Sequence, residues 1–276
     1  MEAWERAFAY LAGAVPAGPR IDADLEVTVH FHPDRAINGK SLLDHLASDG
    51  VYRSQFETGT SNGGLTAYPG GDRWRWEHRI FGGHYDISPA DQRPKYGSLN
   101  YRRHAAGGSV RFGSAHLKLA PSVLERTTFC YPDSVTEPTD FGTAAHLPLV
   151  QLALEDTLDV IDDHIEAHIH GPMRLDQDVS ELVLDPSFRD TPVAEAAAKL
   201  PFPFSWHHGF KLHVDQLRGH EAFRGANVVE LGVAIAQDGW LTPKIVGEAV
   251  NGGHHDPDLL KKVWHCLARF GHDWAS

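Results

Sequence analysis

The sequence predicts an α+β protein in which a mixed region of strands and helices precedes a helical C-terminal subdomain. Two segments, Val27–His32 and Ile161–Gly171, alternate apolar and polar side chains with the two-residue period of a strand. From about Thr191 the pattern changes, and most of the remaining segments are typical of helices. We therefore expect an N-terminal helix and linker over residues 1–24, a mixed core of strands and helices over 25–190 and a helical subdomain over 191–276.

The composition is that of a folded protein. Of the 276 residues, 42% are hydrophobic and 7 are tryptophan, so the chain can bury a sizeable core. A formal net charge of −12 argues against an extended nucleic-acid surface. The cysteines, Cys130 and Cys266, are too few for a disulfide framework and favour a reducing compartment.

The N-terminal residues favour an amphipathic helix over a targeting segment. They include Glu2 and Glu5 and lack the basic region that opens a signal peptide. No apolar run in the sequence approaches the ~20 residues that span a bilayer. We expect a cytoplasmic protein, or one exported without a cleaved signal peptide, with neither membrane nor nucleic acid as a partner.

The segment Val27–Asn62 is typical of the floor of a small-molecule site. Its opening strand places His30 and His32 on the face opposite to the apolar residues, and a proline then ends the strand. Ser41 is the expected N-cap of a short helix that stops at Gly50. A polar stretch with Arg, Gln and Glu follows.

Two features of this polar stretch could bind an anion. Arg53 could hold a phosphate or carboxylate through two parallel hydrogen bonds, although without further context an ordinary surface ion pair is the favoured explanation. The run Thr58–Gly64 offers backbone N–H groups to phosphates. It lacks the spacing and the Lys-Ser/Thr ending of a P-loop, so this signal is weak.

Glu166 is the strongest candidate for a catalytic carboxylate. It shares the polar face of its strand with His168 and His170, while isoleucine and alanine occupy the other face. A Gly-Pro pair ends the strand, which suits the wall of a cleft. A strand with one solvated face is the alternative explanation.

The histidines also permit a metal site. His30, His32, Glu166, His168 and His170 could together offer nitrogen and oxygen ligands from two strands, provided that these strands are neighbours. A metal-dependent hydrolase that uses the four imidazoles is therefore an alternative function.

Two further segments are expected to be strands. Arg73 and Arg75 alternate with Trp74 and Trp76, which predicts a strand with two unlike faces. The residues Val110–Leu119 alternate in the same way, with a glycine as a possible bulge. The tryptophan pair is more typical of a core than of a ligand stack.

Several long motifs together resemble a known family. They are HFHPDR, SDGVYRSQFETGTSNGGL, GGDRWRWEHRIFGGHYD, RPKYGSLN, RFGSAHLKL and IEAHIHGPMRL. Over roughly residues 25–272 the chain resembles a bacterial domain-of-unknown-function family, whose relatives look similar to the CteC-like effectors that attach ADP-ribose to a threonine of ubiquitin. The resemblance implies a split, mostly antiparallel β core of the ADP-ribosyltransferase type.

The same resemblance implies an activity, that of an NAD-dependent protein mono-ADP-ribosyltransferase, which is a glycosyltransferase. NAD would be the co-substrate, a protein hydroxyl would be the acceptor, possibly a threonine of ubiquitin, and no metal would be needed. Glu166 would be the catalytic residue. Glu57 is the alternative, because Gln55-Phe56-Glu57 carries the Gln-x-Glu pattern of arginine-modifying members. The residues expected to bind NAD are His30, His32, Arg53, Ser61, Asn62, Tyr96 and Ser114.

The resemblance implies a role for most of these residues. His30 or His32 would hold the adenosine ribose, and Arg53 the pyrophosphate. Tyr96 would stack on nicotinamide, and Ser114 would form a hydrogen bond nearby.

Overall fold

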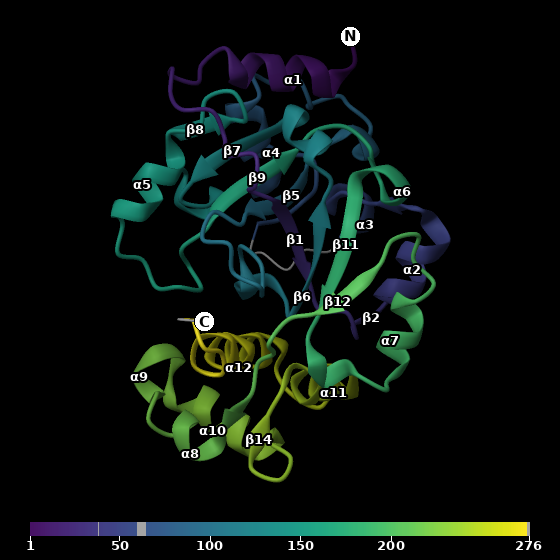
Figure 1. Cartoon of the computed structure of the whole chain (residues 1–276), viewed down its shortest axis with the longest axis vertical. Helices are drawn as coiled ribbons and strands as arrows, with labels where there is room; N and C mark the ends of the chain where they lie inside the picture. Colours follow the sequence, from purple (N-terminus) through teal and green to yellow (C-terminus); the bar gives the residue numbers. More distant parts are fainter. Residues whose placement is uncertain (38, 60–64, 275–276) are drawn as a thin grey trace.

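A computed structural model describes the chain except for residues 38, 60–64 and 275–276. It is a mixed α+β structure, as expected, with a large sheet in one part and a layer of helices in the other (Figure 1). None of the helices in the described part of the chain combines the length and the apolar character that crossing a bilayer requires.

In the described residues the main sheet has eight strands. Their order is β12 (Phe204–Trp206), β11 (Val179–Leu184), β6 (Ala115–Leu119), β1 (Val27–Phe31), β5 (Lys95–Leu99), β9 (Ile165–Ile169), β7 (Thr127–Tyr131) and β8 (Asp140–Thr143). All neighbouring pairs are antiparallel except β11 and β12. The sheet is therefore mostly antiparallel, and β1 and β9 both flank β5.

One face of the sheet carries the main apolar core. The alternating residues of β1 and β9, such as Val29 and Ala167, belong to it. The helices α2 (Leu42–Asp49), α5 (Leu149–Glu155) and α7 (Pro192–Ala197) cover this face. Figure 1 shows α5 at one edge of the sheet and α2 and α7 at the other.

The short helix α2 forms where the capping residues predicted it. Ser41 is its N-cap, and the Ser41 hydroxyl accepts a hydrogen bond from the Asp44 N–H. Gly50 ends the helix in the left-handed conformation, which glycine adopts without strain.

The opposite face of the sheet is polar near its centre and apolar toward β7 and β8. The helices α1 (Ala3–Ala12) and α4 (Asp72–Ile80) cover the apolar end, in a cluster that includes Trp76, Phe81 and Tyr85. Because helices pack on both faces, the polar residues of β9 are buried and do not face solvent.

The strand that we expected around Trp74 and Trp76 is wrong, because these residues lie in α4. The Arg-Trp-Arg-Trp alternation fits a strand, but burial recurs with the helical spacing at Arg73, Trp76, Glu77 and Ile80. Gly71 precedes the first turn as the N-cap. The helix therefore places Arg73 and Glu77 on one buried side, four residues apart.

The strand predicted over Val110–Leu119 begins only at Ala115. A short 3₁₀ helix, η2 (Val110–Phe112), precedes it. At Gly113 the chain passes so close to β1 that a Cβ atom would lie 2.2 Å from the Phe31 carbonyl carbon. Only a glycine fits there, and the strand starts after it.

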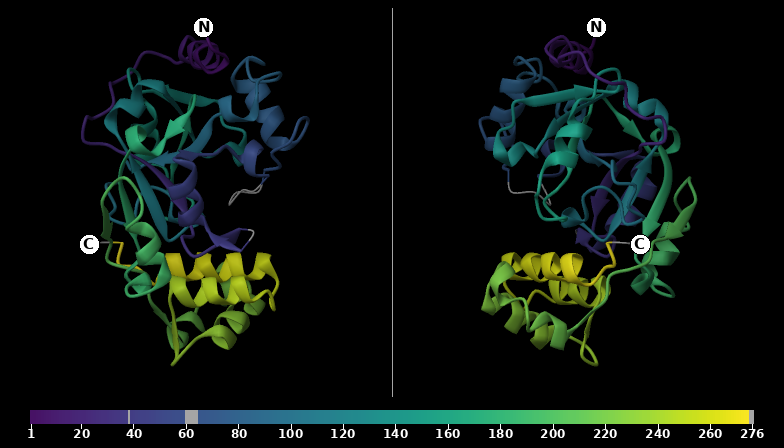
Figure 2. Two further views of the ribbon diagram at one scale, coloured as in Figure 1. Left: turned by 90° about the vertical axis from the view of Figure 1, so that its right-hand side faces the viewer. Right: turned by 60° about the vertical axis from the view of Figure 1, so that its left-hand side comes forward.

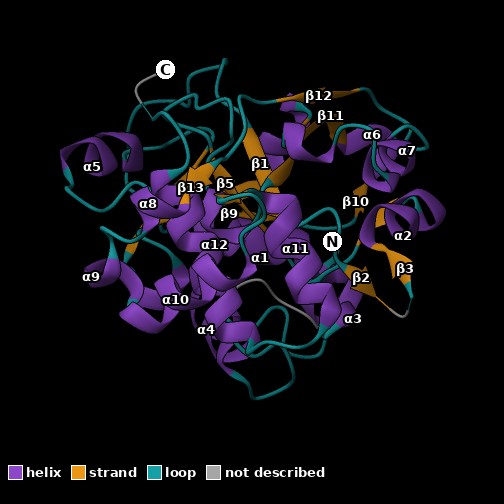
Figure 3. Cartoon of the chain, turned by 90° about the horizontal axis from the view of Figure 1, so that it is seen from below, coloured by secondary structure: helices purple, strands orange, loops and turns teal. Residues whose placement is uncertain are grey.

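The C-terminal helices have a core of their own. The helices of this part are α8 (Val214–Leu217), α9 (Glu221–Arg224), α10 (Ala226–Ile235), α11 (Pro243–Gly252) and α12 (Pro257–Phe270). Figure 2 shows α11 and α12 side by side below the sheet, and Figure 3 shows this layer from below. The preceding elements α7 and β12 pack with the core of the sheet instead.

The remaining described elements are short. They are β2 (Ala36–Ile37), β3 (Lys40–Ser41), β4 (Val51–Tyr52), α3 (Gln55–Thr58), η1 (Ala90–Gln92), η3 (Pro121–Arg126), η4 (Ser134–Thr136), β10 (Met173–Arg174), α6 (Leu175–Asp178), η5 (Pro186–Phe188), β13 (Leu212–His213) and β14 (Trp240–Leu241).

Candidate functional site

The register of the sheet aligns four polar or sulfur-bearing side chains across neighbouring strands. Thr28 of β1 lies opposite Ser98 of β5, which lies opposite Glu166 of β9, which lies opposite Cys130 of β7. Side chains at paired positions share one face of a sheet. Glu166 therefore lies on the polar face, beneath α4.

Glu166 is buried, with 6% of its surface exposed, and three side chains contact its carboxylate. His168 Nε2 lies 3.2 Å from Oε1, and Arg73 Nη1 lies 3.6 Å from the same oxygen. The Ser134 hydroxyl donates to Oε2 across 2.9 Å. The carboxylate is thus matched by a cation and by hydrogen-bond donors, as a buried charge requires.

These contacts keep Glu166 ionised. Burial alone would raise the pKa of the carboxyl, but the hydrogen bond with His168 and the charge of Arg73 outweigh it and lower the pKa to about 2. A fixed negative charge therefore lies in surroundings that exclude most water. An electrostatic interaction with this charge is stronger there than in water.

Arg73 connects Glu166 to Tyr96. Its Nη1 donates to the Ser134 hydroxyl across 2.7 Å, and its guanidinium carbon lies 3.9 Å from the centre of the Tyr96 ring. One face of Tyr96 is therefore covered by Arg73 rather than open for nicotinamide. The Nε of Arg73 is buried and has no hydrogen-bond partner among the described residues.

Glu77 is a second buried carboxylate next to Tyr96. Its pKa is raised, whereas that of Glu166 is lowered. The Tyr96 hydroxyl donates to it across 2.9 Å, and Arg93 forms a buried ion pair with it. Burial raises the pKa of Glu77 to about 7 in spite of the charge of Arg93. The group that we call the Glu166 network consists of Glu166, His168, Arg73, Ser134, Tyr96, Glu77 and Arg93.

The two carboxyl groups of this network have widely different pKa values. Glu166 has a pKa of about 2 and Glu77 a pKa of about 7. Carboxyl groups that their environments push in opposite directions are typical of catalytic sites. The network is therefore the strongest candidate for chemistry in the described part of the chain.

His30 lies on the same face of the sheet as Glu166, but backbone groups occupy both of its nitrogens. Nδ1 lies 3.1 Å from the Gly113 carbonyl oxygen, and the Ser109 N–H donates to Nε2. The ring stacks on His116 at 5.0 Å. Burial lowers the pKa of His30 to about 3, so the imidazole is neutral and held by the fold.

His32 lies past the end of β1 and has different surroundings. It lines a cavity of about 250 Å³ between η2 and the helices α11 and α12. The edge of its ring faces Trp264 of α12, with the ring centres 5.1 Å apart. The structure therefore places the two predicted adenosine-binding imidazoles in separate environments.

Arg53 and Glu57 lie near the surface in α3 and the turn before it. Arg53 is 48% exposed, and its Nε contacts Asp49 at 2.9 Å. Glu57 accepts the Ser54 N–H in a capping box at the start of α3. Both contacts are those of ordinary surface and capping residues.

The remaining predicted residues are Ser114, which the structure describes, and Ser61 and Asn62, which it does not. Ser114 is buried, and its hydroxyl has no hydrogen-bond partner among the described residues. Ser61 and Asn62 lie outside the described residues.

The role on the pyrophosphate of NAD that the resemblance implies for Arg53 predicts a higher KM for NAD in Arg53→Ala. The structure leads us to expect a KM within about twofold of the wild-type value instead, because an exposed ion pair already holds the guanidinium. The measurement is the initial rate of nicotinamide release at several NAD concentrations. A tenfold higher KM would instead assign Arg53 to the pyrophosphate, as the sequence suggested.

The four imidazoles of the alternative metal site do not come together. Within the described residues, the group whose possible ligand atoms lie within 4.8 Å of one another is Cys130, Glu166 and His168. His168 and His170 are instead linked through the Thr128 hydroxyl, at 3.1 and 2.9 Å. Arg73 next to Glu166 opposes a further cation at that point.

Four members of the Glu166 network were not among the site residues expected from the sequence. They are Arg73, Glu77, Arg93 and Ser134. Arg73 and Glu77 are four residues apart, so a helical assignment of that segment would have placed both on one face. Ser134 lies at the start of η4, and nothing in its local sequence predicts that it contacts β9.

One family model matches the chain, in two overlapping segments. It is described as "Protein of unknown function (DUF3626)" and matches residues 26–160 and 147–270. A search of curated proteins found no match.

Proposed function

Because the chain belongs to the DUF3626 family of proteins of unknown function, we propose a function from its own residues: an NAD-dependent protein mono-ADP-ribosyltransferase. The observation that carries the proposal is the Glu166 carboxylate, which is buried on β9 and yet ionised by His168 and Arg73. The proposed fold is the ADP-ribosyltransferase type of split β core, with β1, β5 and β9 at its centre.

The proposed reaction transfers ADP-ribose from NAD to a protein hydroxyl. The bond between nicotinamide and ribose breaks, and its electron pair leaves with nicotinamide. The ribose carbon becomes positively charged and forms a bond with the acceptor oxygen, which releases its proton to water. A fixed carboxylate beside that carbon stabilises the positive charge as it develops.

The low pKa of Glu166 supports an electrostatic role over that of a general base. A carboxylate with a pKa of about 2 takes up a proton poorly at neutral pH. The charge, however, is fully present there, and its donors hold it in a fixed position. The order of elements, an imidazole-bearing strand followed by a short helix and a later acidic strand, also fits the implied fold.

The polar groups around Glu166 suit a substrate with several hydroxyl oxygens. Arg73 Nε, on the guanidinium that contacts Glu166, is a buried donor without a partner among the described residues. Ser114 does not belong to this group, because it precedes β6, and β1 and β5 lie between β6 and β9. A threonine of ubiquitin as acceptor, and a role as an exported effector, are proposed from the sequence resemblance alone.

The direct test is incubation of the purified chain with NAD and ubiquitin, followed by mass spectrometry of both proteins. We expect the mass of one ADP-ribose on ubiquitin and the release of one nicotinamide for each transfer. The reaction should proceed unchanged in the presence of a chelator, because the four imidazoles of the alternative hydrolase do not share one site. Absence of any ADP-ribosylated product with several acceptor proteins would refute the proposal.

A further inference from the structure

The cavity beside His32 lies where the sheet part meets the C-terminal helices. It has a volume of about 250 Å³. Residues from the loop after β1, from η2 and from α11 and α12 line it, among them Arg35, Arg111, Phe112, Lys261 and Trp264. Two parts of the chain, each with its own apolar core, therefore line one cavity. Ligand sites commonly lie between two such parts.

Lys261 is the side chain in this cavity that most needs an explanation. It lies on α12, half buried, and forms no ion pair or hydrogen bond with any residue that the structure describes. Burial and the nearby charge of Arg111 lower the pKa of its ammonium group. An unpaired ammonium in these surroundings is stabilised when an anion binds.

Arg111 and Arg35 add to the positive charge. Arg111 Nη1 donates a hydrogen bond to Asp162 Oδ1 across 2.6 Å. The guanidinium has further N–H donors in the same plane. The acidic residues of the lining are Asp34 and Asp258. Burial raises the pKa of Asp34 to about 6, which reduces the opposing charge in mildly acidic solution.

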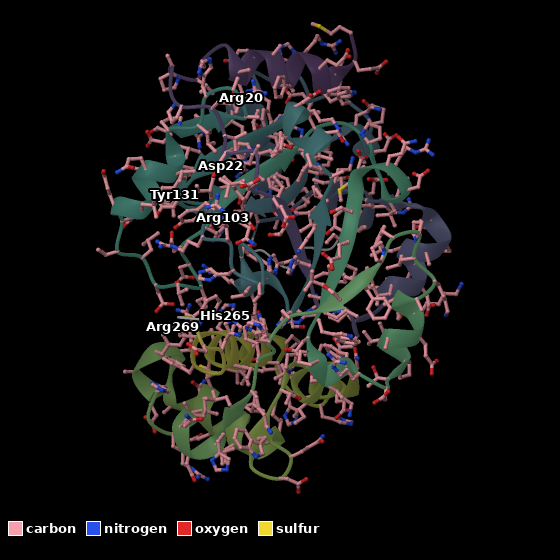
Figure 4. All side chains as sticks on the ribbon, viewed as in Figure 1. Arg20, Asp22, Arg103, Tyr131, His265 and Arg269 are labelled. Carbon is pink, nitrogen blue, oxygen red and sulfur yellow. The ribbon has the colours of Figure 1, made fainter. Side chains whose placement is uncertain are left out.

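His265 lies on α12 outside the lining of the cavity, and two of the lining cations, Arg111 and Lys261, are close enough to affect it. It is 5% exposed, and its Nε2 has no hydrogen-bond partner among the described residues. Burial, and then the charges of Arg111, Arg224 and Lys261, lower its pKa to about 3. Figure 4 places His265 on the side of α12 that faces the sheet. In a chain of net charge −12, this concentration of positive charge is a local feature.

The other part of the lining is apolar and aromatic. Phe112 and Trp264 supply rings, while Val246, Val250 and Leu260 supply aliphatic surface. A ligand that fits must carry negative charge at one end and a flat or apolar body at the other. Nucleotides have this combination, because a base stacks on aromatic rings while phosphate oxygens bind Lys and Arg.

We propose that this cavity binds a nucleotide, with Lys261 and Arg111 on its phosphate and Phe112 and Trp264 beside its base. The nucleotide is either the ADP portion of NAD, in which case the inference rests on the proposed function, or a separate mononucleotide. In both cases the shared chemistry is a phosphate ester on a nucleoside. His32 then lies at the ligand, whereas His30 does not.

Calorimetric titration of the full chain with AMP, ADP-ribose and NAD tests this proposal. Lys261→Ala should weaken nucleotide binding about tenfold or more, because a charge-assisted contact to phosphate is lost. Lys262→Ala is the matched control, since it removes the same charge from an exposed position one residue along α12. It should keep the affinity within about twofold. Val250→Phe, which narrows the cavity from α11, should also weaken binding.

The outcomes separate this inference from the proposed function. Binding of all three nucleotides, weakened by Lys261→Ala, assigns the cavity to the ADP end of NAD. Binding of AMP alone, with the same sensitivity, assigns it to a separate nucleotide. Both outcomes stand even if no transfer is detected. Nucleotide binding that Lys261→Ala and Val250→Phe leave unchanged, or no binding of any of the three, overturns the proposal, even if transfer is active.

Discussion

Replacing Glu166 with Gln is expected to lower the rate of ADP-ribose transfer by about 100-fold or more, the typical cost of losing one electrostatic contact to a transition state. The substitution keeps the size and planar shape of the side chain, replaces one acceptor oxygen with an NH2 donor, and removes the charge. In the proposed reaction it is this charge that would stabilise the positive ribose carbon as nicotinamide leaves. The measurement is the single-turnover rate of product formation, read by mass spectrometry with the chain in excess over the acceptor.

Two comparisons make this result specific. Glu57→Gln removes the other acid that the sequence offered, and we expect it to keep most of the activity because Glu57 serves as a cap of α3. NAD binding to Glu166→Gln should stay near the wild-type affinity. Full transfer by Glu166→Gln, or loss of transfer in Glu57→Gln alone, would move the catalytic role away from β9.

The ionised Glu166 carboxylate also makes the stability of the folded chain depend on pH. Its pKa is about 2 in the folded chain against an ordinary value of 4.5, so its ionised form is favoured by folding. The stabilisation is fully present above pH 4.5 and is lost as the pH falls from 4.5 toward 2. The transfer rate at neutral pH should therefore not depend on the titration of Glu166.

The sequence predicted the strands of the site well because their alternation coincides with burial. In β1 and β9 every second residue enters the apolar core, so the faces of Val29 and Ala167, and hence of His30 and Glu166, followed from the period. The same reasoning expected His30 and His32 on one face. It does not hold for His32, because β1 ends at Phe31 and the chain then turns toward α12.

The part of the site that could not be predicted is the part that lies on other elements. The alternation of Arg73 and Arg75 with Trp74 and Trp76 has the two-residue period of a strand and predicts one. The same segment also places Arg73 and Glu77 four residues apart, which fits the buried side of a helix. Only the packing of α4 against the cluster around Phe81 and Tyr85 decides between these two patterns. Ser134 reaches Glu166 from a loop, and the position of a loop depends on the whole fold.

Arg73→Met is expected to lower the free energy of unfolding by about 3 kcal/mol at neutral pH, because it leaves a buried carboxylate without its cation. Methionine fills a similar length with apolar atoms, so lost packing contributes little. The loss should shrink as the pH falls, since Glu166 can then take up a proton and become neutral. Urea unfolding at several pH values measures both effects.

Arg75→Met provides the matched control for this prediction. Arg75 lies on the same helix with 70% of its side chain exposed, and its ion pair with Asp72 is a surface pair. Its replacement should change the free energy of unfolding by less than about 1 kcal/mol. If the two variants lost equal stability, the Arg73–Glu166 contact would have no special energetic role.

The double variant Arg73→Met, Glu166→Gln separates the ion pair from the other contacts of each residue. Removing both charges together leaves no uncompensated ion in the interior, so we expect the double variant to be more stable than Arg73→Met alone. A coupling energy near zero in this cycle would mean that Arg73 acts through Ser134 and Tyr96 instead. Glu166 would then be held ionised chiefly by His168, and the charge proposed for catalysis would survive the loss of its cation.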